Sequence, residues 1–278
     1  MDKVCYNGDY IDKSNFSFSI DNRAFKYGDA FFETIRCSFG NPLFWEEHYF
    51  RMAGSFFMMK MDVPDSFDME NFKIFIQTLL TKNHLSDQSA RIRISFFRNG
   101  SGYYLPKNHS VDFLIESEAL KNNYYCLNKN GIKLGLYKDN TIMDNNLGRL
   151  KSTNRLLNVL AAIYSRENNY DECLLVNSQN NIVEAVSGNL FIIVNDLIIT
   201  PPLEDGCIDG VLRKVLMNEK KFNIQQKHIS FSDLLNAQEI FITNVISGVQ
   251  WVSQFKNNIY KNNVSNKLLN FLNQTFLV

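Results

Sequence analysis

The sequence has no excess of charge of either sign. Lysine and arginine together number 29, aspartate and glutamate also number 29, and the formal net charge is zero. Proteins that bind nucleic acid or anionic membranes usually carry a basic surplus or a basic cluster. The even balance therefore argues against nucleic acid and membrane surfaces as partners.

Long hydrophobic runs are also missing. No apolar stretch approaches the roughly 20 residues of a membrane helix, and the polar segment from Met1 to Asp9 lacks the apolar core of a signal peptide. Hydrophobic residues still make up 45% of the 278 residues, enough for one large domain or two ordinary ones. We therefore expect a soluble cytoplasmic protein.

Several catalytic signatures are absent. The five cysteines form no Cys-x-x-Cys pair, which favours buried thiols in a reducing compartment. The four histidines show no metal-ligand spacing, so no metal is expected. No Gly-x-Ser-x-Gly or Walker-type loop is present, and Asn99-Gly100-Ser101-Gly102 is too short for a dinucleotide fingerprint.

The first part of the chain mixes strand and helix patterns. Alternation predicts strands over residues 31–38, 90–97 and 111–115, and apolar residues at helical spacing predict helices over 45–60 and 69–82. The polar stretch Lys121-Asn122-Asn123 is the best linker candidate. We expect an α+β domain over residues 1–120 and a second domain over 124–278.

The second part is richer in strands. The patterns predict strands over residues 131–137, 172–176, 182–185, 189–194 and 241–244. Helices are expected over residues 154–167 and 211–219, and a polar helix ends the chain. The fold class is therefore a two-domain α+β or α/β protein.

Lys151 and Glu184 are the first candidates for chemistry. Lys151 precedes the helix expected from Asn154, where the positive end of the helix dipole would depress the pKa of an amine. An unprotonated amine is what Schiff-base chemistry requires. Glu184 lies within an apolar strand, so it either faces solvent or is a buried acid with a cationic partner.

A phosphate site is indicated by three other segments. The turn before Val211 contains Gly210 and opens a helix, whose backbone N–H groups attract an anion. Arg51 lies on the helical face of His48 and is suited to a charge-assisted bond to phosphate, although a solvated arginine is the ordinary reading. Thr243 and Asn244 end a strand and add hydroxyl and amide donors.

In this order, the segments resemble the fold-type IV pyridoxal-phosphate enzymes, also called the class IV aminotransferase family. The resemblance runs from Asn22-Arg23-Ala24-Phe25-Lys26 to Phe241-Ile242-Thr243-Asn244. It implies a D-amino-acid aminotransferase-like fold, with pyridoxal 5'-phosphate (PLP) bound between an N-terminal α+β domain and a barrel-like C-terminal domain. It also implies a small-molecule substrate and a homodimer.

The resemblance implies the following roles. Lys151 attaches the cofactor through a Schiff base and moves protons, Glu184 bonds the pyridine nitrogen, and Arg51 bonds the phosphate. The backbone at Ile208 and Val211 cradles ring and phosphate beside Thr243 and Asn244. Leu212 stands where many aminotransferases have a threonine, so one hydroxyl to the phosphate is missing.

Within the family, the pattern is closest to 4-amino-4-deoxychorismate lyase. Lys151-Ser152-Thr153-Asn154-Arg155-Leu156 and the pair Glu33-Thr34 both look like the lyase version, and no Arg-x-His clamp follows Arg98. The expected products are 4-aminobenzoate, a folate precursor, and pyruvate, with Thr34 as candidate proton donor. Arg98 is the tentative ligand of a substrate carboxylate, with Arg91 and Arg93 as alternatives.

Two other functions remain open from the residues. One is an aminotransferase of branched-chain or D-amino acids with a 2-oxo acid acceptor, in which Lys151 returns a proton to the cofactor. The other is a homologue that keeps the fold but binds without catalysis.

Overall fold

The computed structural model describes residues 2–277, which form two compact units. Unit 1 comprises the residues up to Asn123 together with Lys151–Asn154. Unit 2 comprises Tyr124–Leu150 and the residues from Arg155 onward. The short segment 151–154, which carries the candidate lysine, is therefore part of unit 1 although both of its flanks belong to unit 2.

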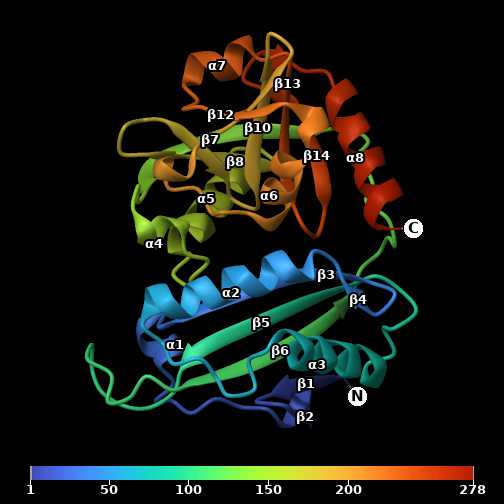
Figure 1. The fold of residues 1–278 in the computed structure, drawn as a ribbon. Coiled ribbons are helices and arrows are strands. Elements are labelled where there is room, and N and C mark those ends of the chain that lie inside the picture. Colours follow the sequence, from blue (N-terminus) through green and yellow to red (C-terminus); the bar gives the residue numbers. More distant parts are fainter. Residues whose placement is uncertain (1, 278) are drawn as a thin grey trace. The chain divides into compact units, whose positions relative to one another are not determined.

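In its described part, unit 1 is built on a six-stranded antiparallel sheet (Figure 1). Three helices accompany this sheet: α1 (Arg23–Tyr27), α2 (Trp45–Met59) and α3 (Met69–Lys82). Across the sheet the strands are β2 (Asp9–Asp12), β1 (Lys3–Tyr6), β6 (Val111–Ala119), β5 (Ala90–Arg98), β3 (Ala30–Ser38) and β4 (Asn41–Pro42).

The core of unit 1 is aromatic and lies between the sheet and helices α2 and α3. Phe31 of β3 stacks on Phe96 of β5 with ring centroids 4.9 Å apart, and Phe56 of α2 meets both rings edge-on at 5.0 Å. Alternation along β3 puts Phe31, Glu33 and Ile35 on this same inner face. Glu33 is thus a carboxylate in a hydrophobic row, and it must find polar partners there.

Segment 151–154 extends the sheet beside the start of β3. The amide of Phe32 donates to the carbonyl of Lys151 at 3.0 Å, and Phe31 and Ser152 form an antiparallel bridge. Gly28, at φ 64°, ends α1 in a left-handed conformation, and its carbonyl accepts a 3.1 Å bond from Asn154. A side chain at Gly28 would meet the Asn154 amide at 2.1 Å, so the position requires glycine.

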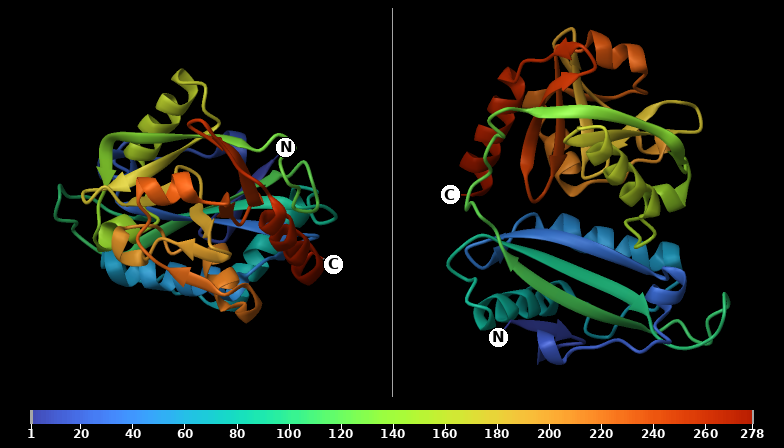
Figure 2. Two further views of the ribbon diagram at one scale, coloured as in Figure 1. Left: turned by 90° about the horizontal axis from the view of Figure 1, so that it is seen from above. Right: turned by 180° about the vertical axis from the view of Figure 1, so that it is seen from behind.

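Unit 2 contains a mixed nine-stranded sheet whose central strands close into a ring. The strands β10, β13, β14, β7, β8 and β9 pair in turn, and β9 returns to pair with β10. In the right-hand view of Figure 2, β7 is the long light-green strand that crosses this unit. The bounds are β7 (Ile132–Ile142), β8 (Glu172–Asn177), β9 (Ile182–Ala185), β10 (Asn189–Val194), β13 (Glu239–Asn244) and β14 (Gly248–Phe255).

Shorter strands and helices complete unit 2. Strands β11 (Leu197–Thr200) and β12 (Ile224–Gln226) extend the sheet beyond β10, and β15 (Asn258–Ile259) pairs with β14. The helices are α4 (Asn146–Arg149), α5 (Leu156–Glu167), α6 (Val211–Asn218), α7 (Phe231–Asn236) and α8 (Asn263–Phe276). Among residues 2–277, no helix is long and apolar enough to span a membrane.

Most predicted elements are present, and several have different bounds. Strand β6 continues to Ala119 and β7 to Ile142, beyond the ends predicted at residues 115 and 137. Helix α5 begins at Leu156 rather than Asn154, because residues 151–154 pair with β3 instead of entering the helix. The prediction of a two-domain fold mixing helices and strands is confirmed.

Glu239 of β13 provides a test of how unit 2 holds its last helix. Its buried carboxylate accepts from the backbone N–H of Val264 at 3.0 Å and of Ser265 at 3.2 Å, in the first turn of α8. In Glu239→Gln an amide NH₂ replaces one oxygen, so we expect a loss of about 1–3 kcal/mol of unfolding free energy. Urea denaturation measures this loss.

The control is Glu167→Gln at an exposed position in the last turn of α5. It should change stability by less than about 0.5 kcal/mol. Equal effects of the two substitutions would contradict the capping role of Glu239.

Candidate functional site

Lys151 lies on the face of β3 that is opposite to the hydrophobic core. Its ammonium nitrogen sits 4.6 Å from the centre of the Phe32 ring, and Phe32 and Thr34 share this face by strand alternation. The two residues predicted to be catalytic, Lys151 and Thr34, are thus brought to one face of unit 1. More than a hundred residues separate the two in the sequence, so no local pattern indicated that they share a face.

The expected reason for the reactivity of Lys151 is wrong. The residue lies five positions before α5, whereas the helix dipole acts only within the first turn. Lys151 is held by the edge of β3, and its ammonium group faces an aromatic ring.

By strand alternation Arg93 of β5 also lies on this face. It is the direct partner of Thr34 in the β3–β5 ladder, and its guanidinium lies 3.9 Å from the centre of the Phe32 ring. Burial lowers the pKa of Arg93 and nearby Arg91 lowers it further, but it remains a strong cation because arginine titrates far above neutrality. Arg93 is therefore well placed to receive an anionic group near Lys151.

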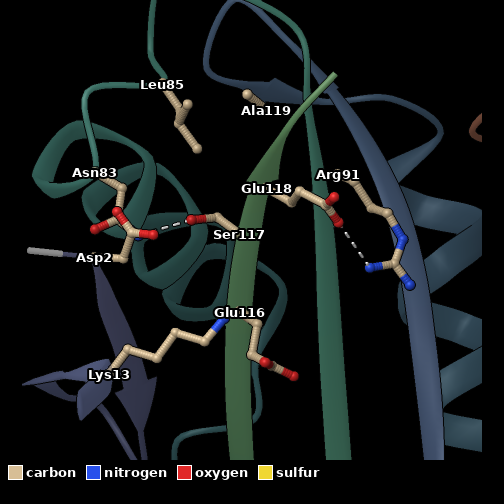
Figure 3. A pocket seen from close by; sticks show the side chains of 9 residues that line it. All are labelled: Asp2, Lys13, Asn83, Leu85, Arg91, Glu116, Ser117, Glu118 and Ala119. Atoms are coloured by element: carbon tan, nitrogen blue, oxygen red, sulfur yellow. Dashed lines mark hydrogen bonds and ion pairs between the residues drawn. The ribbon is translucent and has the colours of Figure 1, made fainter. Parts of the chain in front are cut away.

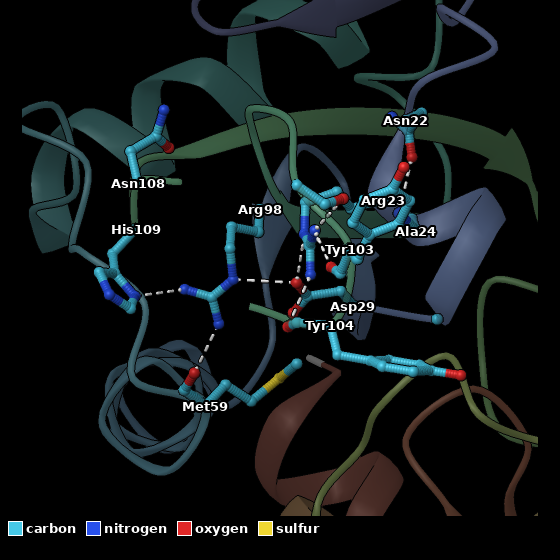
Figure 4. A network of polar contacts seen from close by, with 12 residues as sticks. Asn22, Arg23, Ala24, Asp29, Met59, Arg98, Tyr103, Tyr104, Asn108 and His109 are labelled. Atoms are coloured by element: carbon cyan, nitrogen blue, oxygen red, sulfur yellow. Dashed lines mark hydrogen bonds and ion pairs between the residues drawn. The ribbon is translucent and has the colours of Figure 1, made fainter. Parts of the chain in front are cut away.

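Arg98 has a different environment (Figure 4). Its guanidinium donates to Asp29 at 2.9 Å and to the carbonyls of Lys60 and Met59 at 2.9 and 2.7 Å, and it contacts His109. These bonds fasten the end of α2 to β5. The assignment of Arg98 to a substrate carboxylate stays a prediction, and its engaged nitrogens weigh against it.

Arg23 completes the same network and organises the loop after β5. It is buried, bonds Asp29 at 2.8 Å, and donates to the carbonyls of Gly102 and Tyr103 (Figure 4). Two guanidinium groups therefore share Asp29, and their remaining donors are turned to backbone carbonyls. Arg23 and Arg98 therefore hold the backbone in place, and Arg93 is the better candidate to bind a substrate carboxylate.

Arg91, the third alternative, belongs to a surface pocket of about 400 Å³ (Figure 3). It lies 3.6 Å from Glu118, and both acidic and basic side chains line the pocket. Neither Lys151 nor Thr34 is among the residues that line it. Arg91 shares the Arg93 face of β5 but lies opposite Arg36 rather than Thr34, so it is the weaker candidate for the substrate carboxylate.

Arg51 forms a bidentate ion pair with Glu33. Its Nε donates to Glu33 Oε2 at 3.1 Å, and Nη2 donates to Oε1. The same carboxylate contacts Nδ1 of His48 at 2.8 Å. Glu33, His48 and Arg51 therefore form one polar cluster on the core side of β3, with Glu33 on the strand and the other two on α2.

The charge states within this cluster follow from burial and contact. Burial alone would raise the pKa of Glu33, but Arg51 and the hydrogen bonds hold that pKa far below its usual range. Burial lowers the pKa of His48 despite the neighbouring carboxylate, and Arg51 and Lys151 lower it further. The cluster is therefore a carboxylate, a guanidinium and a neutral imidazole.

In unit 2, Glu184 lies where the ring of strands closes. It pairs with Leu175 of β8 on one side and with Asn189 of β10 on the other. Its side chain is only 4% exposed, and its Oε2 accepts from the backbone N–H of Ile208 at 2.9 Å. Of the two readings that the sequence left open, the buried acid is correct.

Asn189, which the sequence reasoning missed, holds the loop before α6. Its amide donates to the carbonyl of Ile208 at 2.8 Å, so Ile208 is bound through both its N–H and its C=O. A Cβ at Gly210 would meet Asn189 Oδ1 at 1.8 Å, and one at Gly188 would meet the carbonyl of Thr243 at 2.5 Å. The sequence feature that could have indicated this role is the asparagine at the start of the apolar run 189–194.

Thr243 has the strongest sign of an absent ligand in unit 2. Its side chain is 1% exposed, and among the described residues its hydroxyl oxygen has no hydrogen-bond partner. Buried hydroxyl groups are nearly always bonded, so this one indicates a polar group from outside the chain. Neighbouring Asn244 instead caps a turn through the N–H groups of Ile246 and Ser247.

The predicted phosphate turn opens helix α6. Gly210 precedes Val211, the first residue of the helix, and no side chain caps this end. Leu212, the departure from the usual threonine, is 1% exposed and packs into the interior. The hydrogen-bonding capacity at this helix start therefore comes from the backbone.

Asp205 anchors the loop that leads to Ile208. It is buried and accepts from His228 at 2.9 Å and from Asn181 at 3.0 Å. The bond to Asp205, and then its charge, raise the pKa of the exposed His228 imidazole. A pKa raised on folding stabilises the fold below the unfolded value, and this stabilisation is lost as pH rises through the folded value.

His228→Gln tests this anchor. We expect its stability deficit relative to the parent protein to be largest below about pH 6.5, the ordinary histidine value, and to shrink at higher pH. Urea denaturation at several pH values measures the difference. A deficit that is constant across this range would contradict a charged His228–Asp205 pair.

Comparison with known proteins identifies the family of the chain. The model of a family described as "Amino-transferase class IV" matches residues 30–255. An aminodeoxychorismate lyase of Vibrio harveyi is 27% identical, over 84% of this chain and 86% of its own. A putative branched-chain-amino-acid aminotransferase of Methanocaldococcus jannaschii is 24% identical, over 99% and 95%.

Two solved structures show the shared fold. A putative 4-amino-4-deoxychorismate lyase from Legionella pneumophila superposes with a TM-score of 0.82 at 28% identity, covering 95% of this chain and 97% of its own. A branched-chain aminotransferase from Thermobaculum terrenum, determined in its PLP form, gives a TM-score of 0.85 at 15% identity, covering 98% and 92%.

Proposed function

Because the chain belongs to the class IV aminotransferase family, we propose that it is a 4-amino-4-deoxychorismate lyase that forms 4-aminobenzoate and pyruvate. The observation that carries the proposal is the shared face of Lys151, Thr34 and Arg93 in unit 1. It supplies a proton-moving amine, a hydroxyl donor and a cation for a carboxylate, which are the groups that elimination of pyruvate needs.

The chain is an enzyme, and its cofactor is pyridoxal 5'-phosphate. The residues present fit this group. Unit 1 offers the amine of Lys151, while unit 2 offers the buried carboxylate of Glu184 and the unbonded hydroxyl of Thr243. When bound, PLP supplies an electron sink for the carbon that carries the substrate amine.

In unit 1, we assign proton movement to Lys151 and Thr34. Lys151 Nζ removes the proton from the ring carbon that bears the amine, and the C–O bond to the enolpyruvyl group then breaks. Thr34 Oγ1 gives a proton to the departing group, which leaves as pyruvate while the carbocycle becomes aromatic, and the proton taken up by Lys151 then restores the Thr34 hydroxyl. Arg93 holds a substrate carboxylate by a charge-assisted bond.

Arg51 bonds the phosphate through the edge of its guanidinium that Glu33 does not use. The pair with Glu33 occupies Nε and Nη2 on one side, so the Nη1 side is the one turned away from the carboxylate. The prediction for Arg51 is therefore compatible with its ion pair.

In unit 2, Glu184 supplies negative charge to the pyridine nitrogen, with Ile208 N–H fixing its orientation. Thr243 Oγ1 and the backbone at Val211 bond the phosphate, and Asn244 shapes the adjoining turn. Because Leu212 contributes no hydroxyl, Thr243 becomes the principal side-chain donor to the phosphate from this unit.

Aminotransferase activity is the second candidate. The relatives include branched-chain and D-alanine aminotransferases at 24–25% identity, close to the 27% of the lyase. In an aminotransferase, Lys151 would return the proton that it removed from the substrate, and a 2-oxo acid would accept the amino group. Arg98 is bonded within a structural network, and the Arg-x-His clamp of D-amino-acid aminotransferases is not visible there, which favours the lyase.

A homodimer also remains part of the proposal. Helix α5 exposes Leu156, Val159, Leu160 and Ile163 at helical spacing, which is suited to covering by another surface.

The decisive experiment supplies the purified protein with 4-amino-4-deoxychorismate and measures 4-aminobenzoate and pyruvate. We expect both products in equal amounts, with no need for a 2-oxo acid. Lys151→Ala should remain folded, lose the cofactor absorbance, and lower the rate by more than about a hundredfold. A panel of L- and D-amino acids with 2-oxoglutarate is run in parallel.

Amino transfer without release of pyruvate would overturn the lyase in favour of the aminotransferase. A protein that stays colourless with added PLP would contradict the cofactor assignment itself.

Thr243→Val tests the phosphate site separately. Its hydroxyl has no hydrogen-bond partner among residues 2–277, so the unfolding free energy of the cofactor-free protein should change by less than about 0.5 kcal/mol. The dissociation constant for PLP should rise about ten- to a hundredfold, as expected for a lost bond to a charged group.

Thr200→Val is the matched control. Thr200 is equally buried in unit 2, but its hydroxyl donates to the carbonyl of Leu190 at 2.8 Å. It should lose about 1 kcal/mol of stability with no change in PLP affinity. A loss of PLP affinity in Thr200→Val but not in Thr243→Val would contradict a role of Thr243 in binding the phosphate.

A further inference from the structure

Glu33 and His48 form a buried pair that the proposed chemistry does not use. Glu33 is 1% exposed and His48 is completely buried, within an apolar row that would pack as well with hydrophobic residues. Burying such groups is unfavourable unless they are bonded, and replacing a buried ion pair with apolar residues is often neutral or stabilising. Stability alone therefore gives a weak account of the pair.

The geometry of the pair is directed at Arg51. Both Glu33 oxygens contact the Nε–Nη2 edge of the guanidinium, and Oε1 also contacts His48 Nδ1 at 2.8 Å. A bidentate pair fixes the plane of a guanidinium as well as its position. His48 restrains the carboxylate from the other side, so rotation of Glu33 away from Arg51 would break both contacts.

The contacts also determine the tautomer of His48. A carboxylate only accepts hydrogen bonds, so the imidazole must carry its proton on Nδ1. Nε2 is then an acceptor, and within residues 2–277 it has no hydrogen-bond partner. The ring is thus held through Nδ1 alone, at the cost of one unsatisfied buried nitrogen.

We propose that Glu33 and His48 are positioning residues that hold the guanidinium of Arg51 in the orientation required for the cofactor phosphate. The inference depends on the phosphate role of Arg51 in the proposed function, but not on the choice between lyase and aminotransferase. His48 acts on Glu33 and Glu33 acts on Arg51. Of these three residues, only Arg51 contacts the phosphate.

The test compares the affinities of the cofactor-free protein for PLP and for pyridoxal, which lacks the phosphate. The ratio of the two dissociation constants, the phosphate selectivity, isolates the phosphate interaction from the rest of the site. Arg51→Gln should lower this selectivity about ten- to a hundredfold. Glu33→Gln and His48→Leu should lower it in the same direction while Arg51 is still present.

Two further variants separate positioning from a general structural role. His48→Asn keeps a donor near the place of Nδ1 and should retain most of the selectivity that His48→Leu loses. Glu33→Gln should have no additional effect on selectivity when Arg51→Gln is already present, as expected for residues that act through one group. Circular dichroism and thermal unfolding establish that each variant is folded.

Wild-type selectivity in folded Glu33→Gln and His48→Leu would overturn the proposal, as would equal losses in His48→Asn and His48→Leu. Nitrogen NMR of the parent protein provides a readout that needs no variant, with a proton expected on His48 Nδ1 and none on Nε2. A proton on Nε2 with none on Nδ1 would also overturn it. Failure of the parent protein to bind PLP would instead contradict the proposed function.

Discussion

The candidate chemistry of unit 1 depends on a short piece of antiparallel pairing between β3 and residues 151–154. Backbone bonds between Phe32 and Lys151, and between Thr153 and Ala30, attach this segment to the sheet edge. Since paired residues share a face, this register puts the Lys151 side chain beside Phe32 and Thr34. A shift of one residue would turn the lysine toward the other side, and the Gly28–Asn154 contact opposes such a shift.

Two buried carboxylates are held in contrasting ways. Glu33 is neutralised by the guanidinium of Arg51 and bonded to His48, so its charge is satisfied within unit 1. Glu184 accepts a hydrogen bond from the backbone N–H of Ile208, and it interacts electrostatically with Arg155. A buried carboxylate fixed in place in this way is suited to a cationic partner such as a protonated pyridine nitrogen.

Much of the secondary structure was predictable because its signals are local. Helix α3 runs from Met69 to Lys82 as its apolar spacing predicts, and Asp68 caps its start. Strands β9 and β10 have the bounds that their apolar runs predict. Helix α5 was extended too far toward Lys151 because the residues before it also suit a helix, and only their pairing with a distant strand prevents one.

The sequence alone determined the family and, with it, the cofactor, because Lys151, Glu184, the Gly210 turn and Thr243 follow one another in the order on which the resemblance rests. It did not determine which polar side chains act together. That Arg93 rather than Arg98 lies with Lys151 against Phe32, that Glu33 and His48 meet Arg51, and that Asn189 holds Ile208 depend on strand register and helix packing. These contacts join residues far apart in the chain, so no local pattern encodes them and only the tertiary structure decides them.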